Sequence, residues 1–306
     1  MSKFLFYTDL HLAAKVPRHR TDIYSQSILV KMREIYQIAQ DVNVDFVAFG
    51  GDFFNSHRIF SYETINEAMD IMCTVDFKTL AVIGQHDLVG HNQQTYKSST
   101  LAFIERHCPM FFVMDGPVDI GDAVLHPCHW YSDFDECLQQ RVTKRKKSIL
   151  LAHKTITMGK LPYETIRTCD IDCGFNLVLS GDWHSGFEVH EENGTVFYNP
   201  GSISRRKITE MDRRIKVGII SAKIGHPVDI QDVFLDNVRP GGEVFDVDYI
   251  EEVRDAARMD TSKFVSGIME LEKEAVDIFE LVEKAGRQKG IRQEVLDYIA
   301  TKNSSI

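Results

Sequence analysis

The first indication of the fold is the segment at residues 4–12, which reads FLFYTDLHL. It begins with four apolar or aromatic residues, which is typical of a buried strand, and the polar residues Asp9 and His11 follow. In an extended chain, alternate side chains point to opposite faces. The segment therefore predicts a strand that ends with Asp9 and His11 on one side and Leu10 in the core.

Polar side chains follow four more strand-like runs in the same way. The runs are 46–49, 80–83, 149–152 and 177–179. They lead to Gly51-Asp52, to Gly84-Gln85-His86-Asp87, to His153 and to Gly181-Asp182-Trp183-His184. The glycines permit a sharp turn and a close backbone approach. Ligands gather at the carboxyl ends of strands in α/β sheets, so side-by-side strands would bring these carboxylates and imidazoles to one rim.

Strand-like and helix-like segments alternate, which predicts a mixed α/β layer fold. The clearest helix should follow Thr21 and Asp22 as caps, because apolar residues recur at 28, 32, 35, 36 and 39. Further strands are expected at 196–198, 217–221 and 228–234. Pro240-Gly241-Gly242 precedes an acidic, helix-like stretch. We therefore expect one domain at 1–240 and a helical C-terminal region at 241–306.

The composition is that of an ordinary globular protein, with 306 residues, 43% hydrophobic and 26% charged. No apolar run approaches the roughly 18 residues that a bilayer requires, and Asp9 and His11 interrupt any leader-like stretch. The six cysteines are scattered without a CxxC pair. We expect a cytoplasmic protein with no membrane association.

The formal charge of −10 argues at first against a nucleic-acid partner. Residues 241–306, however, hold 15 acidic and 9 basic residues, net −6, which leaves −4 for residues 1–240. Two divalent cations would cancel that remainder. Crowded carboxylates also require a cation, and mixed His/Asp sets suit Mn, Fe or Zn.

In their order and spacing these motifs resemble the calcineurin-like metallophosphoesterase superfamily, whose pattern is DxH, GD, GNH[DE], H and GHxH. The resemblance covers about residues 1–235, and Asn199-Pro200-Gly201-Ser202 also matches. It implies a four-layer β-sandwich flanked by helices. Within the superfamily the chain is most similar to SbcD-type DNA repair nucleases, because a basic Arg205-Arg206-Lys207 follows the last motif and the phosphoprotein phosphatase signature GDxxDRG is absent.

The resemblance also implies a role for each motif residue. The residues expected at a first metal are Asp9, His11 and His184, with Asp52 as the bridge to a second. The residues expected at the second metal are Gln85, His153 and Asp182. His86 would act on the phosphate as an acid or transition-state stabiliser, and Asp87 would orient it. Two metals would supply Lewis-acid catalysis of phosphodiester hydrolysis without a covalent intermediate.

Two residues depart from the family pattern. Gln85 stands where the family has Asn, and Asp182 stands where it has His. Both would lie at the second metal, where a carboxylate oxygen in place of an imidazole favours Mn²⁺, or alternatively Mg²⁺, over Zn²⁺. The same departures also fit a second site that binds its metal only weakly.

Other candidates have less specific patterns. His126, Cys128 and His129 resemble a metal cluster, but without a second pair they fit partly buried polar groups at a strand end better. The basic run at 144–147 fits a solvated strand entry better than a phosphate site. The loop at 90–99 fits equally a wall of a substrate groove and an ordinary polar connection.

The acidic C-terminal region carries two apolar stripes, at Phe264, Ile268, Leu271, Ala275, Ile278 and Val282 and at Val265, Met269, Val276 and Phe279. One stripe would pack within the protein and the other on a partner. In SbcD-type nucleases the regions after the phosphoesterase domain cap the DNA groove and dock an SbcC-type ABC ATPase. The resemblance thus implies a two-metal deoxyribonuclease, either exonuclease or endonuclease, in a bacterial cell or a phage-infected host. It implies DNA and this ATPase as partners, and the possibility of a homodimer stays open.

Two rival functions remain. A phosphoesterase of small or cyclic phosphates would need a closed pocket in place of an open groove. A metal-poor scaffold for protein binding would fit the departures at Gln85 and Asp182.

Overall fold

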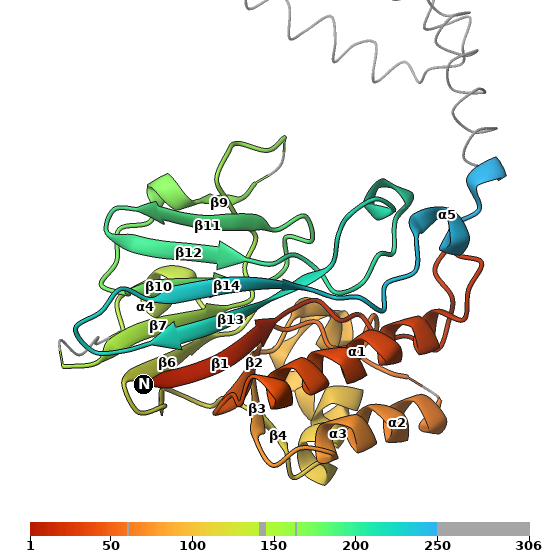
Figure 1. Cartoon of the computed structure of the whole chain (residues 1–306), viewed down its shortest axis with the longest axis horizontal. Coiled ribbons are helices and arrows are strands. Elements are labelled where there is room, and N and C mark those ends of the chain that lie inside the picture. The colour runs from red at the N-terminus through yellow and green to blue at the C-terminus, as the bar shows by residue number, and fades with distance from the viewer. Residues whose placement is uncertain (60, 141–144, 163, 250–306) are drawn as a thin grey trace, which may run out of the picture. The chain divides into compact units, whose positions relative to one another are not determined.

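The computed structural model describes residues 1–59, 61–140, 145–162 and 164–249 (Figure 1). Met1–Phe245 forms one compact unit. Its last helix is α5 (Gly241–Val244), after which the buried Phe245 ring lies 5.0 Å from the Arg20 guanidinium. The boundary expected after residue 240 stays a prediction. The two apolar stripes of the C-terminal region lie outside the described residues.

Two six-stranded sheets form the centre of this unit (Figure 1). The first has the order β14-β13-β1-β2-β3-β4 and the second the order β11-β12-β10-β7-β6-β5. The strands of the first sheet are β1 (Ser2–Tyr7), β2 (Phe46–Phe49), β3 (Lys78–Ala81), β4 (Phe111–Val113), β13 (Lys216–Ala222) and β14 (Asp229–Phe234). Those of the second are β5 (Val118–Asp119), β6 (Ala123–Cys128), β7 (Lys147–Ala152), β10 (Leu177–Ser180), β11 (Phe187–Glu192) and β12 (Thr195–Asn199).

In the first sheet the adjacent strands β1, β2, β3 and β4 are parallel, and in the second β12, β10, β7 and β6 are parallel. The remaining strands pair antiparallel with their neighbours. The expected strand runs are confirmed except that the third lies two residues earlier, at Lys78–Ala81 instead of 80–83. The idea that all five motif strands lie side by side in one sheet is wrong. Strands β1, β2 and β3 belong to the first sheet, whereas β7 and β10 belong to the second. A separate pair, β8 (Ile156–Thr157) with β9 (Ile166–Arg167), follows the β7 motif.

Side-chain alternation along the strands produces the layers. Phe4 and Phe6 of β1 pack between the sheets against Leu151 and Leu179, while Leu5 and Tyr7 pack under the helices. A third cluster, which includes Val178, covers the outer face of the second sheet. The unit is therefore an α/β fold with two mixed sheets packed on each other and flanked by helices, as expected.

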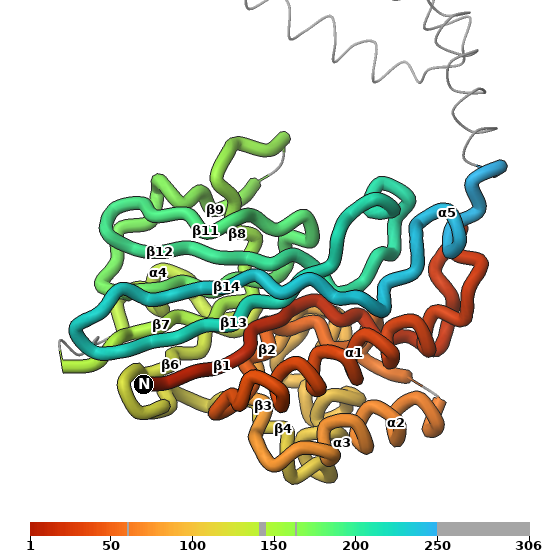
Figure 2. Tube along the Cα trace, viewed as in Figure 1, coloured from red at the N-terminus to blue at the C-terminus, as the bar shows by residue number. Residues whose placement is uncertain are grey.

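The helices on the first sheet are α1 (Tyr24–Asp41), α2 (Tyr62–Cys73) and α3 (Thr100–His107), and the tube trace shows them together on one face (Figure 2). Helix α4 (Phe134–Leu138) packs on the second sheet. Short 3₁₀ turns lie at Gln85–Asp87, Val89–His91, Gln93–Ser98, Thr168–Asp170 and Ile208–Glu210. Among the described residues, no helix is both long and apolar enough to cross a membrane.

The expected caps of α1 are wrong. Its N-cap is Ile23, which makes no side-chain cap hydrogen bond. Asp22 instead accepts hydrogen bonds from the Arg20 guanidinium at 2.8 and 2.6 Å, because a buried arginine requires a partner for its charge.

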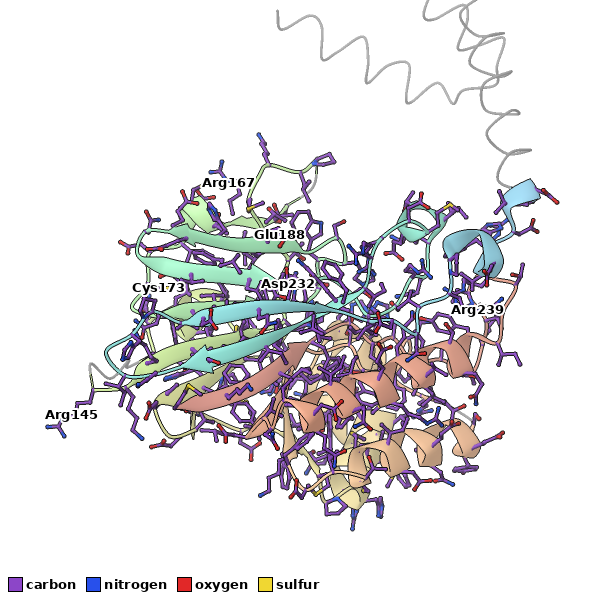
Figure 3. All side chains as sticks on the ribbon, in the orientation of Figure 1. Arg145, Arg167, Cys173, Glu188, Asp232 and Arg239 are labelled. Carbon is purple, nitrogen blue, oxygen red and sulfur yellow. The ribbon has the colours of Figure 1, made fainter. Side chains whose placement is uncertain are left out.

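A buried cation joins the two sheets at their exposed edge. Lys216 of β13 donates to Glu188 of β11 at 2.7 Å and to Asp232 of β14 at 2.8 Å. Figure 3 labels both carboxylates, of which Glu188 belongs to the second sheet and Asp232 to the first. The ion pairs therefore tie the first sheet to the second.

Candidate metal centre

The loops after β1, β2, β3, β7 and β10 bring the motif side chains of both sheets together. Three sets of ligand atoms lie within 4.8 Å of one another: Asp9 with His11 and His184, His11 with Asp52 and His86, and Asp9 with Asp52 and His153. The first sheet supplies Asp9, His11, Asp52 and His86, and the second supplies His153 and His184. The centre is thus built at the junction of the two sheets.

Asp52 lies in the middle of the centre. Its Oδ2 atom is 3.6 Å from His11 Nε2, 3.6 Å from His153 Nε2 and 4.0 Å from His86 Nε2. Its Oδ1 atom accepts a hydrogen bond from the His86 backbone N–H at 2.9 Å, which fixes the carboxylate. An oxygen between imidazoles of both sheets is placed as a bridging ligand would be.

Asp9 lies beside two imidazoles on one side of the centre. Its Oδ1 atom is 3.7 Å from His11 Nε2 and 3.6 Å from His184 Nε2, and these two nitrogens are 3.0 Å apart. Two ligands about 2.1 Å from one ion and at right angles lie about 3 Å apart. This spacing fits coordination of one ion by the expected first-metal residues.

Unpaired acceptors show that the residues fit a cation. Asp9 Oδ1 and Asp52 Oδ2 are buried and have no hydrogen-bond partner. A buried carboxylate oxygen without a partner is costly unless a cation compensates it. Burial alone would lower the pKa of His153, but the neighbouring Asp52 carboxylate raises this pKa to about 10. The buried centre therefore requires positive charge, which metal ions would supply.

Gln85 and Asp182 lie next to each other, on the side of His153. Gln85 Oε1 is 2.8 Å from His153 Nε2, and Gln85 Nε2 donates to Asp182 Oδ1 at 2.6 Å. The second oxygen of Asp182 accepts from the Thr155 hydroxyl. The structure thus places the amide oxygen of Gln85 toward the centre and Asp182 behind it, 3.8 Å from His153 Nε2. A ligand role for Asp182 stays a prediction.

His86 is the most exposed imidazole of the centre, with 34% of its side chain exposed against 23% for His184. Its Nδ1 atom lies 3.1 Å from the Asn55 carbonyl oxygen, so this N–H donates and Nε2 faces Asp52. A phosphate that approaches the centre would meet His86, as expected for an acid or a transition-state stabiliser.

The partners of the Asp87 side chain are backbone N–H groups and not the His86 ring, which Asp87 was expected to orient. Its buried carboxylate accepts backbone hydrogen bonds from Gly84, Asp52, Phe53 and Phe54 at 2.9 to 3.4 Å. Burial and the Asp52 carboxylate raise the pKa of Asp87 to about 7. In the structure Asp87 therefore fixes the loops that carry Asp52 and Gln85, while the Asn55 carbonyl orients the His86 ring.

The backbone of the motif loops is left-handed, not extended. The φ angle is 53° at Asp9, 47° at His11, 56° at Asp52 and 73° at Asp182. The period-two argument for Asp9 and His11 is therefore wrong in its geometry, although Leu10 is buried as expected. Non-glycine residues in this region cost about 1–3 kcal/mol and cluster at functional sites.

The glycines of the motifs are required by close contacts. A methyl group at Gly51, where φ is 97°, would lie 2.4 Å from His153 Nδ1. One at Gly84 would lie 2.0 Å from Asp52 Oδ1. The expected close backbone approach at the rim is confirmed.

Glu210 is a site residue that the sequence does not reveal. Its carboxylate lies 3.1 Å from His184 Nδ1 and accepts the backbone N–H groups of Arg206 and Lys207 at 2.6 and 3.0 Å. Burial would raise its pKa, but the hydrogen bond from His184 and these backbone bonds hold the pKa down to about 2. A carboxylate behind a ligand imidazole fixes its tautomer and orientation. In the sequence Glu210 is a single glutamate in the loop after the last motif, and no local pattern marks it as part of the site.

The Asn199-Pro200-Gly201-Ser202 segment supports both neighbouring motifs. Asn199 Oδ1 accepts the Gly201 N–H at 2.8 Å, and its Nδ2 donates to the Trp183 carbonyl at 3.1 Å. Ser202 Oγ donates to the Asp9 carbonyl at 2.9 Å. The segment therefore connects the His184 loop with the Asp9 loop.

The other histidine candidate is a structural one. His129 Nδ1 accepts the Ile83 N–H at 3.0 Å and its Nε2 lies 2.9 Å from the Met114 carbonyl oxygen. His126 Nδ1 lies 2.9 Å from Gln140 Oε1. His126, Cys128 and His129 are buried, as the non-metal interpretation of this strand end expects.

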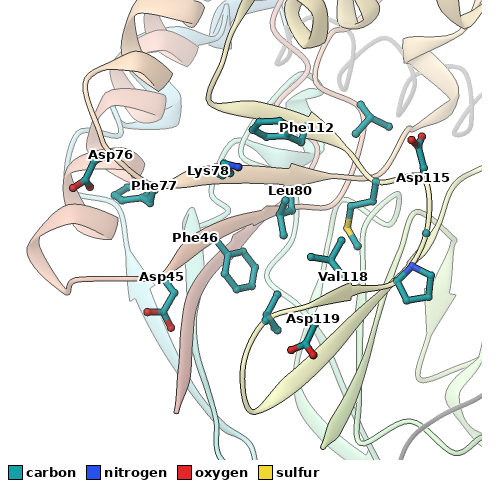
Figure 4. Close-up of a pocket in the computed structure, with 15 residues that line it drawn as sticks. Asp45, Phe46, Asp76, Phe77, Lys78, Leu80, Phe112, Asp115, Val118 and Asp119 are labelled. Carbon is teal, nitrogen blue, oxygen red and sulfur yellow. The ribbon is translucent and has the colours of Figure 1, made fainter.

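A pocket of about 790 Å³ lies at the other end of the first sheet (Figure 4). Phe46 and Lys78, the first residues of β2 and β3, line it together with Phe112 and Val118. The pocket holds none of the expected site residues. It is therefore separate from the metal centre, which lies after the last residues of the same strands.

Fold and centre together define a class of protein: an α/β layer protein whose two sheets converge on a site suited to two metal ions. The family model of the calcineurin-like phosphoesterases matches residues 2–186, and the chain belongs to this family. The family is one of phosphoesterases, which are hydrolases.

The chain is also similar to individual proteins. It is 23% identical over 236 residues to the DNA double-strand break repair protein Mre11 of Methanosarcina acetivorans, with 69% of this chain and 35% of that protein covered. The chain thus spans about a third of the length of this curated relative. Among solved structures it is similar to TT1561 of Thermus thermophilus, at 13% identity and a TM-score of 0.48, with 78% of this chain and 99% of that chain covered. A dimetal phosphatase from Danio rerio gives 9% identity and a TM-score of 0.47, with 76% and 98% covered.

Proposed function

We propose that the protein is a two-metal DNA nuclease that hydrolyses phosphodiester bonds as the nuclease subunit of an SbcCD-type repair and recombination complex. The observation that carries the chemistry is the unpaired Asp52 Oδ2 atom between imidazoles of both sheets. The likeness to a DNA double-strand break repair protein supports DNA as the substrate. The resemblance of the motifs to SbcD-type nucleases supports the same substrate class.

Asp9, His11 and His184 would hold one metal, and Asp52 would bridge to the second. Gln85, His153 and Asp182 would hold that second metal. When bound, such a metal pair supplies Lewis-acid activation of a phosphodiester and of the attacking water. The donor set of carboxylate, amide and imidazole suits Mn²⁺, with Mg²⁺ as the alternative.

The protein's own groups position the substrate and move the proton. His86 presents Nε2 at the accessible side of the centre, while its Nδ1 hydrogen bond to Asn55 fixes the ring. A hydrogen on Nε2 would stabilise the negative charge of a phosphate oxygen or protonate the leaving oxygen. The Asp87 carboxylate keeps Asp52 in place through its backbone bonds.

The experiment compares substrates on one purified sample with Mn²⁺. End-labelled linear duplex DNA, bis(p-nitrophenyl) phosphate and p-nitrophenyl phosphate are assayed side by side with the full chain and with Asp52→Asn. We expect cleavage of the duplex that is lost in Asp52→Asn, together with about two bound metal ions per wild-type chain. Turnover of the small esters with intact DNA would identify a small-phosphate esterase and refute the nuclease. A chain that binds no metal would support the alternative of a metal-poor scaffold for protein binding.

The partner is part of the same proposal. We expect an SbcC-type ATPase to bind the C-terminal region, residues 241–306, and to increase cleavage. Met269→Glu with Phe279→Glu should then abolish co-purification with the ATPase while cleavage by the isolated chain remains. Complex formation that is undiminished would contradict this docking, and sedimentation of the isolated chain would show whether it also forms a homodimer.

A further inference from the structure

The imidazoles of the metal centre differ in what their Nδ1 atoms contact. His86 and His153 donate from Nδ1 to backbone carbonyl oxygens at 3.1 and 2.6 Å, and His184 donates to Glu210 at 3.1 Å. A hydrogen on Nδ1 is what coordination through Nε2 requires. Each of these three rings therefore carries a hydrogen on Nδ1, as coordination through Nε2 would require.

His11 has the opposite arrangement. Its Nδ1 atom lies 3.1 Å from Nη1 of the partly buried Arg206. A guanidinium group only donates hydrogen bonds, so His11 Nδ1 must accept and its hydrogen must lie on Nε2. His11 Nε2 lies 3.0 Å from His184 Nε2, which is the acceptor for this hydrogen.

These contacts form a closed ring of hydrogen bonds. Arg206 donates to His11, His11 to His184, and His184 to Glu210. The other oxygen of Glu210 accepts the backbone N–H of Arg206 at 2.6 Å. Every donor in the ring meets an acceptor, so the ring satisfies His11 and His184 without a cation.

Metal binding is incompatible with this ring. Coordination through His11 Nε2 requires that the hydrogen leaves Nε2 and that one arrives on Nδ1, with no net change in protons. Nδ1 would then point a hydrogen at the donor Nη1 of Arg206. Two donors that face each other repel, so Arg206 must leave His11.

We propose that Arg206 is a phosphate-binding residue that metal binding releases from His11. Its backbone stays fixed by Glu210, so the freed guanidinium remains beside the centre, where the phosphate of a substrate arrives. Guanidinium binds phosphate through parallel charge-assisted hydrogen bonds. The inference depends on the two-metal centre of the proposed function, but not on DNA as the substrate.

The test uses the full chain, stripped of metal by a chelator and titrated calorimetrically, first with Mn²⁺ and then with inorganic phosphate on the loaded protein. The variant is Arg206→Met, which has no donor. The matched control is Lys207→Met, since Lys207 is the exposed next residue and contacts Glu210 through its backbone N–H and carbonyl groups.

We expect opposite changes in the two affinities. Arg206→Met should bind Mn²⁺ about 2- to 10-fold more tightly, because a competing hydrogen bond is gone. It should bind phosphate about 10- to 150-fold more weakly, because a charged contact is lost. Arg206→Lys should recover part of the phosphate affinity, and Lys207→Met should resemble the wild type. An Mn²⁺ affinity that is unchanged or lower, or a phosphate affinity within about twofold of the wild type, would overturn the inference.

A second measurement needs no variant. In ¹⁵N spectra of histidine-labelled protein, His11 Nδ1 should lack a hydrogen without metal and carry one after Mg²⁺ is added. A His11 Nδ1 that is protonated in both states would contradict the release of Arg206. Neither result depends on whether the protein cleaves DNA, so a failure of the nuclease assay and a failure of this inference are distinguishable.

Discussion

Gly84→Ala is the substitution for which the structure gives the clearest magnitude. The added methyl carbon would lie 2.0 Å from Asp52 Oδ1 and 2.5 Å from the Asp52 backbone nitrogen, whereas real contacts of this kind stay above 3.0 Å. The Asp52 carboxylate must therefore retreat by about 1 Å, and a misplacement of a catalytic group by that distance costs about 10²-fold in rate. Overpacking adds a loss of stability of about 1–3 kcal/mol.

The assay measures metal stoichiometry, cleavage of duplex DNA and the free energy of unfolding for Gly84→Ala. The matched control is Gly159→Ala, because no atom lies within 4 Å of a methyl group at Gly159. We expect the control to behave as the wild type while Gly84→Ala loses Mn²⁺ affinity and cleavage together. A Gly84→Ala protein that binds two metals and cleaves at the wild-type rate would refute the placement of Asp52 as the bridge.

Three further predictions follow from single side chains. His86→Asn should keep both metals and slow hydrolysis by about 10²- to 10⁴-fold, and near-normal turnover would contradict its catalytic role. Asp182→His should move the metal preference in the cleavage assay from Mn²⁺ toward Zn²⁺, and an unchanged preference would show that Asp182 is not a ligand. Burial and the nearby Arg205 lower the pKa of Lys31 well below its usual value, so the unfolded chain binds the extra proton and stability rises with pH toward about 10.4. Lys31→Met should remove this rise, which is up to about 1.4 kcal/mol per pH unit; urea titrations that show equal pH slopes for variant and wild type would contradict it.

The sequence predicted the strand runs and the motif residues because each has a local signature. An apolar run followed by Asp, His or Gly-Asp is visible at 4–12 and at 46–52 without any knowledge of the partners. The α/β class follows from the same runs. The convergence of these side chains could be expected because ligands gather at the carboxyl ends of parallel strands.

The division into two sheets could not be read from the same runs. A buried strand of one sheet has the same composition as a buried strand of the other, so β7 and β10 look like neighbours of β3. The left-handed backbone at Asp9 and His11 was equally invisible, since tertiary contacts impose it against local preference. Glu210 reaches the centre from a loop far along the chain, and no local pattern distinguishes it from a surface charge. Arg206 belongs to the basic run Arg205-Arg206-Lys207, but that run does not indicate a contact with His11.

The junction of two sheets at the metal centre has a consequence for how the protein unfolds. Ligands from β1 and β2 lie on one side of the junction and ligands from β7 and β10 on the other, so ions held between them would act as a non-covalent cross-link between the layers. An ion that binds only the native state adds RT ln(1 + [L]/Kd) to its stability, about 2.7 kcal/mol at a hundredfold excess over Kd. Separation of the layers and release of the ions would then be one cooperative event. Amide hydrogens of β2 and β7 should accordingly exchange at a common rate in the loaded protein, and chelation should accelerate both together.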